Sequence, residues 1–377
     1  MSKLKKRIFF YQIFASPHIV PLVNQIAAKN VEISLVVEKL ITTDRKLLGW
    51  SLPKPFFIKP IIFQNYKDKL TSKVFLKDAI HICQGLIFNG FVRIVQKKLR
   101  KYNLNQWVLM ESININGNLG KLKKLLYIFL FLIWKNRIKG ILAIGNNSKN
   151  FYSSIGFNKN KIFPFAYFLN DSISNTKSDA YTDPIFKFIF VGQLIKRKNI
   201  TLLIDALSLL KKKFKLQVIG NGPLNKDLIN YAKKILPNKV EWMGDLQMNE
   251  IPKKISDSDC LVLPSYFDGW GAVVSEALMV GTPVICSDNC GSSVVVRSSK
   301  FGYIFQNNNS QDLYLKLKKM INKGKISRKK RAVLNKWARC LGAKSGADYL
   351  IKILLYSSKK NKKKTNSTVE NQKIKIL

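Results

Sequence analysis

Two acidic residues, separated by seven others and with glycines between them, form the segment of this sequence best suited to bind a ligand. Asp268 comes first, Gly269 and Gly271 follow it, and Glu276 closes the segment. Glycines free the backbone at a strand-to-helix turn, so main-chain N–H groups at the start of a helix can face the oxygens of a ligand. Glu276 would lie about one and a half turns into that helix, where its carboxylate can accept hydrogen bonds from sugar hydroxyls.

The same residues also fit an ordinary capped helix. In that interpretation Asp268 caps the helix, the glycines make the turn and Glu276 faces solvent. The spacing alone leaves both interpretations open.

The segments around these residues alternate between short apolar runs and helical patterns. Strands are expected at residues 186–191, 216–219, 240–243, 259–263 and 282–286, and helices after Asn199, before Leu236, and at 271–280 and 311–321. Such alternation is typical of a doubly wound parallel sheet. Ligands bind these sheets beyond the carboxyl ends of the strands, where Gly192 and Gly222 fall.

The first half of the chain shows the same alternation with longer loops. Strands are expected at residues 7–14, 31–37, 56–63, 79–83 and 107–110, and helices at 21–28 and 122–134, while a last helical pattern covers 335–356. The predicted divisions are a first domain at 1–170, a polar linker at 171–184, a second domain at 185–325, C-terminal helices at 326–358 and a basic disordered tail at 359–377. We therefore expect an α/β chain of two doubly wound, Rossmann-like domains, with the active site in a cleft between them.

A series of motifs in the second domain resembles the retaining nucleotide-sugar glycosyltransferases of family 4. The segment from Asp268 to Glu276 resembles the E-x7-E motif of that family, with Asp268 in the place of the first Glu. Three further segments resemble family motifs and occur in the family's order. Residues 190–194 (FVGQL), with Arg197 and Lys198, resemble the motif G-R-L…K-G. Residues 218–223 (VIGNGP) resemble V-x-G-x-G-P, and residues 281–284 (GTPV) match G-x-P-V. The resemblance covers residues 186–306 and is loose in the first half of the chain.

The resemblance implies a GT-B fold, in which the second domain holds the donor and the first binds the acceptor. By position, Arg197 and Lys198 would bind the donor diphosphate, because cations there offset the negative charge that grows on the leaving group. The remaining donor-binding residues implied are Gly192, Gly222, the backbone groups of Gly269, Trp270, Gly271 and Ala272, Glu276 for the ribose hydroxyls and Asp268 for the transferred sugar.

Three residues depart from the family pattern. Asp268 is one methylene shorter than Glu, which could change the contact with the sugar. Gln193 replaces the common Arg, which leaves Arg197 and Lys198 to carry the diphosphate charge. Asn199 replaces a Gly, and we expect it to be tolerated because Asn caps helices well.

The catalytic candidates are Asp268 and two residues of the first domain, His18 and Glu111. In many relatives a histidine of the first domain touches the donor sugar, and this chain has only His18 and His81. His18 follows the first predicted strand, whereas His81 lies inside an apolar run and fits equally well as a structural strand residue. Glu111 closes another strand, near where relatives place their histidine. Asp257 and Asp259 match a D-x-D metal motif only superficially, so we expect a polar loop and no required metal.

The charge of the chain predicts anionic partners. The 377 residues include 65 Lys and Arg against 22 Asp and Glu, a formal net charge of +43. Such a surface attracts phosphates, nucleic acid or an anionic membrane, although codon bias could also produce it. With 46% apolar residues the chain is not wholly disordered. Its five scattered cysteines indicate no disulfide framework and favour a cytoplasmic protein.

An apolar run at residues 125–134 is flanked by lysines. At ten residues it is about half of what a membrane-spanning helix needs. It fits either a helix lying in the membrane interface or a buried helix of the first domain. Together with the lysine-rich tail, it predicts peripheral, salt-sensitive association with an anionic membrane surface.

The sequence thus predicts an enzyme that moves a sugar from a UDP- or GDP-sugar to a glycan or polyprenyl-linked acceptor of a surface polysaccharide, with no further cofactor. One alternative is a sugar-nucleotide-binding protein of the same fold without turnover. A nucleic-acid-binding protein is a weaker alternative, because no nucleic-acid module is recognisable and aromatic residues are not interleaved with the basic clusters.

Overall fold

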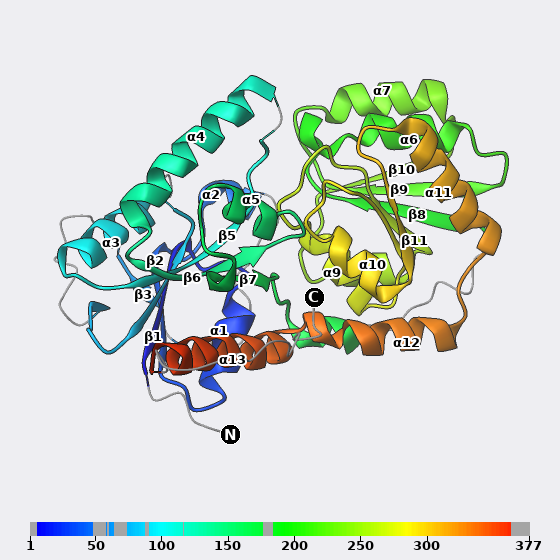
Figure 1. The fold of residues 1–377 in the computed structure, drawn as a ribbon. Coiled ribbons are helices and arrows are strands. Elements are labelled where there is room, and N and C mark those ends of the chain that lie inside the picture. The colour runs from blue at the N-terminus through cyan, green and yellow to red at the C-terminus, as the bar shows by residue number, and fades with distance from the viewer. Residues whose placement is uncertain are drawn as a thin grey trace. The chain divides into compact units, whose positions relative to one another are not determined.

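The computed structural model describes residues 6–47, 58, 60–63, 74–86, 90–115, 117–175 and 184–362. The chain divides into two compact units (Figure 1). The first contains residues 1–42, 52–170 and 342–377, and the second contains 43–51 and 171–341. Residues 56, 57 and 59 of the predicted strand at 56–63 lie outside the described residues, as does the tail beyond residue 362, and the described part of that strand is reduced to Ile61–Ile62.

The described residues of the first unit form a seven-stranded parallel sheet in the order β3-β2-β1-β4-β5-β6-β7. Its strands are β1 (Ile8–Phe14), β2 (Ile33–Lys39), β3 (Ile61–Ile62), β4 (Ile80–Gln84), β5 (Gln106–Glu111), β6 (Ile138–Ile144) and β7 (Ile162–Phe165). The connecting helices include α1 (Val20–Ala27), α3 (Gly90–Lys101), α4 (Gly117–Trp134) and α5 (Ser148–Ser154), while α2 (Thr43–Leu47) is grouped with the second unit. Strands β6 and β7 and helices α3 and α5 were not among the predicted elements.

The second unit contains a six-stranded parallel sheet, within its described residues, in the order β10-β9-β8-β11-β12-β13. Its strands are β8 (Phe186–Val191), β9 (Phe214–Ile219), β10 (Val240–Gly244), β11 (Cys260–Leu263), β12 (Val284–Ser287) and β13 (Gly302–Phe305). The helices are α6 (Ile200–Ser208), α7 (Asn225–Ile235), α8 (Ile251–Ser256), α9 (Ala272–Met279), α10 (Ser293–Ser299), α11 (Ser310–Lys323) and α12 (Arg328–Ala338). The predicted α/β class with two doubly wound sheets is confirmed.

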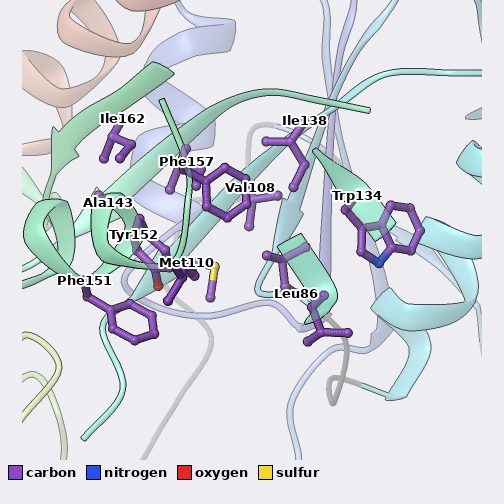
Figure 2. Close-up of a cluster of buried hydrophobic side chains, with 13 residues drawn as sticks. Leu86, Val108, Met110, Trp134, Ile138, Ala143, Phe151, Tyr152, Phe157 and Ile162 are labelled. Carbon is purple, nitrogen blue, oxygen red and sulfur yellow. The ribbon is translucent and has the colours of Figure 1, made fainter. Parts of the chain in front are cut away.

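The central strands of both sheets are apolar on both faces, as expected where crossover helices cover the two sides of a parallel sheet. In β8 and β11 nearly every side chain is buried, and helices before and after each strand cover the two sides of the sheet. In the first unit, a buried cluster joins Val108 and Met110 of β5 to Phe151 and Tyr152 of α5 and to Trp134 at the end of α4 (Figure 2).

The helical pattern predicted at residues 335–356 is divided between two helices. Helix α12 ends at Ala338, a short 3-10 turn covers Arg339–Leu341, and α13 (Ala343–Lys362) begins after Gly342. The chain returns here to the first unit, where the N–H of Ala343 donates to the carbonyl oxygen of Leu169 (2.7 Å). Gly346 packs so closely on Phe168 that a Cβ would lie 2.2 Å from its ring. No helix of the described residues is long and apolar enough to cross a bilayer.

The loops after β8 and β9 pack backbone against backbone, and this close approach requires glycine. The N–H of Gly192 donates to the carbonyl oxygen of Ile219 (3.0 Å), and that of Leu194 to Asn221 (2.9 Å). A Cβ on Gly220, whose φ is +121°, would lie 2.1 Å from the carbonyl oxygen of Gly192. A Cβ on Gly222 would lie 2.5 Å from that of Leu194.

We expect Gly220→Ala to lower the free energy of unfolding by about 2–4 kcal/mol, because it adds a backbone clash to the strain of a positive φ. Chemical denaturation measures the loss. Gly244→Ala is the matched control, since Gly244 also has a positive φ (+64°) but nothing within 4 Å of the added Cβ. It should cost only about 1 kcal/mol. Equal losses in the two variants would contradict the steric argument.

Candidate functional site

The candidate site lies where the strand order of the second sheet reverses. Strand β8 pairs with β9 on one side and with β11 on the other, at Phe188–Cys260 and Ile189–Leu261. The loops that leave the carboxyl ends of β8 and β11 diverge at this point and leave room for a ligand. The first loop carries Arg197 and Lys198, and the second carries Asp268.

A carboxylate and two cations join these two loops. Lys198 Nζ lies 2.5 Å from Asp268 Oδ2, and Arg197 Nη1 lies 3.4 Å from Asp268 Oδ1. The same Arg197 nitrogen donates to the carbonyl oxygen of Phe267 (2.8 Å). Lys198 and Asp268 are largely buried, whereas Arg197 is more exposed. Two positive charges are therefore held against one negative charge, which leaves an excess of positive charge at the site.

Asp268 does not cap the helix that follows it, so the capped-helix interpretation is wrong for this residue. The N-cap position of α9 is Gly271, with φ +83° and no side-chain capping bond. Asp268 is instead anchored through its backbone. Its N–H donates to the carbonyl oxygen of Asn289 (3.2 Å), and its own carbonyl oxygen accepts from Gly291 (2.8 Å).

Asn199 also has a different role from the one expected. It precedes α6 with φ +51° and makes no side-chain capping bond. Lys196–Lys198 form a short 3-10 turn, and the left-handed residue after it redirects the chain into α6. Asn is tolerated here in place of Gly because it adopts the left-handed conformation more readily than other residues with a Cβ.

The turn into α9 carries a run of free backbone donors. Among the described residues, no hydrogen bond uses the N–H groups of Gly269, Trp270, Gly271 or Ala272. Four donors at the start of a helix can receive phosphate or hydroxyl oxygens. The Trp270 side chain, by contrast, is fully buried, and its indole N–H donates to Ser275 Oγ (3.1 Å). The indole therefore fixes the turn and does not face a ligand.

Glu276 lies in the second turn of α9 and is only partly exposed. Burial raises the pKa of its carboxyl from 4.5 to about 7. No hydrogen bond or ion pair to this carboxyl is formed within the described part of the chain. The interpretation of Glu276 as a solvated surface residue is therefore wrong, and the group is available to a ligand's hydroxyls.

The two predicted glycines lie beside these groups for different reasons. A Cβ on Gly192 would lie 3.5 Å from Lys198 Cε, so the lysine side chain packs over this glycine. Gly222 lies in the neighbouring loop and is needed for its contact with Leu194. Gly192 therefore helps to place the cation, and Gly222 supports the loop that holds Gly192.

The loop after β12 completes the site and was missed by the sequence reasoning. Asn289 Nδ2 donates to the carbonyl oxygen of Tyr266 (3.2 Å), which fixes the Asp268 loop from a third strand. The hydroxyls of Ser265 and Ser292 are buried without a hydrogen-bond partner in the described chain. Ser292 Oγ lies 3.3 Å from the position of a Cβ on Gly271. The position of this loop at a strand's carboxyl end was the available signal.

Asp257 and Asp259 lie in the predicted loop, between α8 and β11, but Asp259 is buried there. Its Oδ2 accepts from the N–H of Lys187 (2.8 Å) and lies 3.1 Å from Lys325 Nζ, and its Oδ1 lies 3.6 Å from Arg331 Nη2. Asp257 instead forms an ion pair with Lys253. No group of three or more His, Cys, Asp or Glu that could hold a metal occurs among the residues the structure describes.

In the first unit, His18 and Glu111 lie at the same edge of the sheet. His18 follows β1, and its ring lies 5.4 Å from that of Tyr167. Glu111 ends β5, and its carbonyl oxygen accepts from the Tyr152 hydroxyl. Only β4 separates β1 from β5, so the two strands are about 10 Å apart. His81 is fully bonded inside β4, to Tyr11 Oη and the carbonyl oxygen of Leu76 (3.0 Å each), and burial lowers its pKa.

We expect the Lys198–Asp268 pair to show a coupling energy of about 1–2 kcal/mol in a double-mutant cycle of Lys198→Gln and Asp268→Asn, because it is largely shielded from solvent. Denaturation of the four proteins gives this energy. The exposed pair Lys253–Asp257 is the control and should give about 0.3–0.5 kcal/mol. A Lys198–Asp268 coupling no larger than that of the control would show that the pair does not join the loops.

We expect Glu276→Gln to stabilise the protein at alkaline pH and not at acidic pH. The folded carboxyl titrates near 7, above the unfolded value of 4.5, so its ionisation opposes folding increasingly as pH rises through this range. The free energy of unfolding of the variant should exceed that of the wild type by about 1–3 kcal/mol at pH 8, with no comparable difference at pH 4. Thermal unfolding across pH measures this, with the exposed Glu241→Gln as control. A gain that does not change with pH would refute the burial of this charge.

The second unit is similar in sequence to known glycosyltransferases. Residues 175–339 match the family described as glycosyl transferases group 1. An uncharacterized glycosyltransferase of Methanocaldococcus jannaschii is 28% identical over 205 residues, 51% of this chain and 56% of that protein. The N-acetylgalactosamine-N,N'-diacetylbacillosaminyl-diphospho-undecaprenol 4-alpha-N-acetylgalactosaminyltransferase of Campylobacter jejuni is 32% identical over 143 residues, 37% of this chain and 39% of that protein. The chain thus spans about half or less of the length of these relatives.

Solved structures match over nearly the whole chain. The apo form of the lipopolysaccharide outer core galactosyltransferase WaaB has a TM-score of 0.68 at 15% identity, with 94% of this chain and 99% of that chain covered. HepE of Anabaena in complex with UDP has a TM-score of 0.64 at 15% identity, with 95% of this chain and 98% of that chain covered. At such identities the likeness concerns the fold. The chain has the GT-B fold of these glycosyltransferase structures, and its residues 175–339 match the model of the glycosyl transferases group 1 family.

Proposed function

We propose that this chain is a retaining glycosyltransferase of family 4 that uses a UDP- or GDP-sugar as donor. The observation that supports this most directly is the Lys198–Asp268–Arg197 cluster, which lies beside four backbone N–H groups at the start of α9 that have no hydrogen-bond partner in the described chain. The cluster has an excess of positive charge and the helix start has open donors, so together they suit a diphosphate. Glu276 lies on the same helix and suits the ribose.

In this proposal the residues divide the donor between them. Arg197 and Lys198 bind the diphosphate and offset the charge that grows on it as the sugar leaves. The N–H groups of Gly269, Trp270, Gly271 and Ala272 bind phosphate or sugar oxygens. Glu276 accepts hydrogen bonds from the ribose hydroxyls, and its raised pKa makes this binding favour pH values above about 7, where the carboxylate dominates. Asp268 contacts the transferred sugar.

The chemical step that we propose proceeds on one face of the sugar. The bond between the anomeric carbon and the diphosphate oxygen breaks, and the acceptor oxygen bonds to the same face of an oxocarbenium-like centre. The acceptor proton passes to the leaving diphosphate, so no separate strong base is required. His18 and Glu111 are the proposed contacts of the first unit with the reacting sugar. Because Arg197 and Lys198 supply positive charge, we propose that no metal ion is needed.

The acceptor that we propose is a glycan or a polyprenyl-linked sugar of a surface polysaccharide. The Campylobacter jejuni relative is named for transfer to a diphospho-undecaprenol-linked sugar. An acceptor of that kind resides in a membrane. We therefore propose that the protein works in the cytoplasm, peripherally at the anionic face of the cell membrane, and that its net charge of +43 serves this surface and not nucleic acid.

Calorimetric binding of nucleoside diphosphates and of inorganic pyrophosphate tests the donor site. We expect a selective response to UDP or GDP that does not require magnesium. Lys198→Gln should weaken both the nucleoside diphosphate and pyrophosphate by roughly 10–100-fold, since it removes a charge-assisted bond to phosphate. Glu276→Gln should weaken only the nucleoside diphosphate, because pyrophosphate has no ribose.

Lys213→Gln, at an exposed lysine of the same unit, is the control for general charge and should leave both affinities unchanged. If Glu276→Gln lost as much affinity for pyrophosphate as for the nucleoside diphosphate, the assignment of Glu276 to the ribose would be wrong. Binding of none of the nucleotides by the wild-type protein would overturn the donor site as a whole. Incubation with the selected nucleotide-sugar and a polyprenyl-linked acceptor, with the anomeric configuration read by NMR, then tests retention and separates an enzyme from a binding protein.

A further inference from the structure

Helix α4 presents a row of large apolar side chains to solvent. Their exposed fractions are 75% for Leu119, 64% for Leu122, 63% for Leu125, 59% for Phe129, 54% for Leu132 and 38% for Leu126. At 100° per residue, these six positions fall within about 140° of the helix circumference. A contiguous apolar surface on a folded protein marks an interaction site. We call these six residues the leucine face.

The opposite side of α4 is anchored, so the helix cannot turn the leucine face inward. Trp134 is buried in the cluster formed with β5, β6 and α5 (Figure 2). Leu130 is buried in the same cluster, and Phe131 packs against it. Arg100 lies over the Trp134 ring at 5.8 Å. The N-terminal half of α4 extends away from the strands of its sheet (Figure 1). Of the two interpretations of this segment from sequence, a buried helix is therefore wrong.

The charged residues of α4 and of the chain that follows it are all of one sign. From residue 112 to 170 the sequence contains no Asp or Glu, but nine Lys and Arg: Lys121, Lys123, Lys124, Lys135, Arg137, Lys139, Lys149, Lys159 and Lys161. Lys121 and Lys123 are exposed on α4 itself, one on each side of the leucine face. The partner of this surface must be apolar at its centre and anionic around it.

We propose that the leucine face inserts into the interfacial region of an anionic bilayer, with α4 lying along the membrane plane. A second copy of the chain fits poorly, because a symmetric contact would bring lysines against lysines. A nucleic acid would leave the leucines in water. At 1.5 Å per residue the 18-residue helix is about 27 Å long, and its lysines keep it at the surface. This proposal deepens the membrane association proposed above by assigning it to one helix face.

Co-sedimentation with phosphatidylcholine vesicles containing phosphatidylglycerol tests the proposal at 0.15 M and 0.5 M salt. High salt screens the general attraction of a basic protein, so binding that survives it must come from apolar insertion. We expect the wild type to remain bound at 0.5 M salt. The triple variant Leu122→Ser, Leu125→Ser, Phe129→Ser should lower the partition coefficient there by at least about tenfold.

The matched control replaces exposed apolar residues of the second unit: Leu209→Ser, Leu315→Ser and Val333→Ser. It should bind vesicles like the wild type. UDP or GDP affinity of the α4 variant should be unchanged, which separates failure of this proposal from failure of the donor site. Equal retention of wild type and α4 variant at high salt would overturn it. A second result would also overturn the proposal: light scattering finds the wild type to be a dimer and the α4 variant a monomer, while both bind vesicles equally. The leucine face would then be a self-association surface.

Discussion

The parallel pairing of β8 with β11 determines where every group of the candidate site lies. The two strands are neighbours in the sheet although some 70 residues of chain separate them. Because they are paired, their outgoing loops start about 4.8 Å apart, and the loops then run in opposite directions. The short side chain of Asp268 meets the long side chains of Lys198 and Arg197 across that gap. A shift of this register would move the carboxylate away from both cations.

The site contains several polar groups of the kind that normally form hydrogen bonds within a folded protein. Four N–H groups, the Glu276 carboxyl and the hydroxyls of Ser265 and Ser292 have no partner in the described chain. Each such group costs stability. The surrounding contacts offset the cost: the Trp270 indole fills the space beneath the turn, and Asn289 and Gly291 hold the Asp268 backbone from β12. A ligand with several oxygens would satisfy the open groups at once.

Much of the second unit could be predicted from sequence because its strands are short apolar runs, and three of them (β8, β9 and β10) end in or are directly followed by glycine. The Asp268–Glu276 segment was predicted to bind a ligand from the types and order of its residues together with their resemblance to a family motif, because the spacing alone also fitted a capped helix. Their partners were not, because an ion pair between Lys198 and Asp268 depends on the pairing of β8 with β11, which local patterns do not contain. The role of Asn199 was missed for a related reason: capping and left-handed backbone both favour Asn, and only the backbone angle separates them. Helix α4 was located correctly, but whether its leucines face the core or water depends on which residues its other side contacts.

Helix α13 gives the chain an order of assembly. It belongs to the first unit, where Tyr349 donates to the carbonyl oxygen of Pro164 (2.8 Å) and Asp348 pairs with Lys29 (2.7 Å), yet it is made after the second unit is complete. During synthesis, residues 171–341 can therefore fold as they leave the ribosome, while the unit begun first waits for the end of the chain to cover α1 and β7. Segments on both sides of residues 171–341 thus form one unit, and residues 171–341 are, in topological terms, an insertion within it.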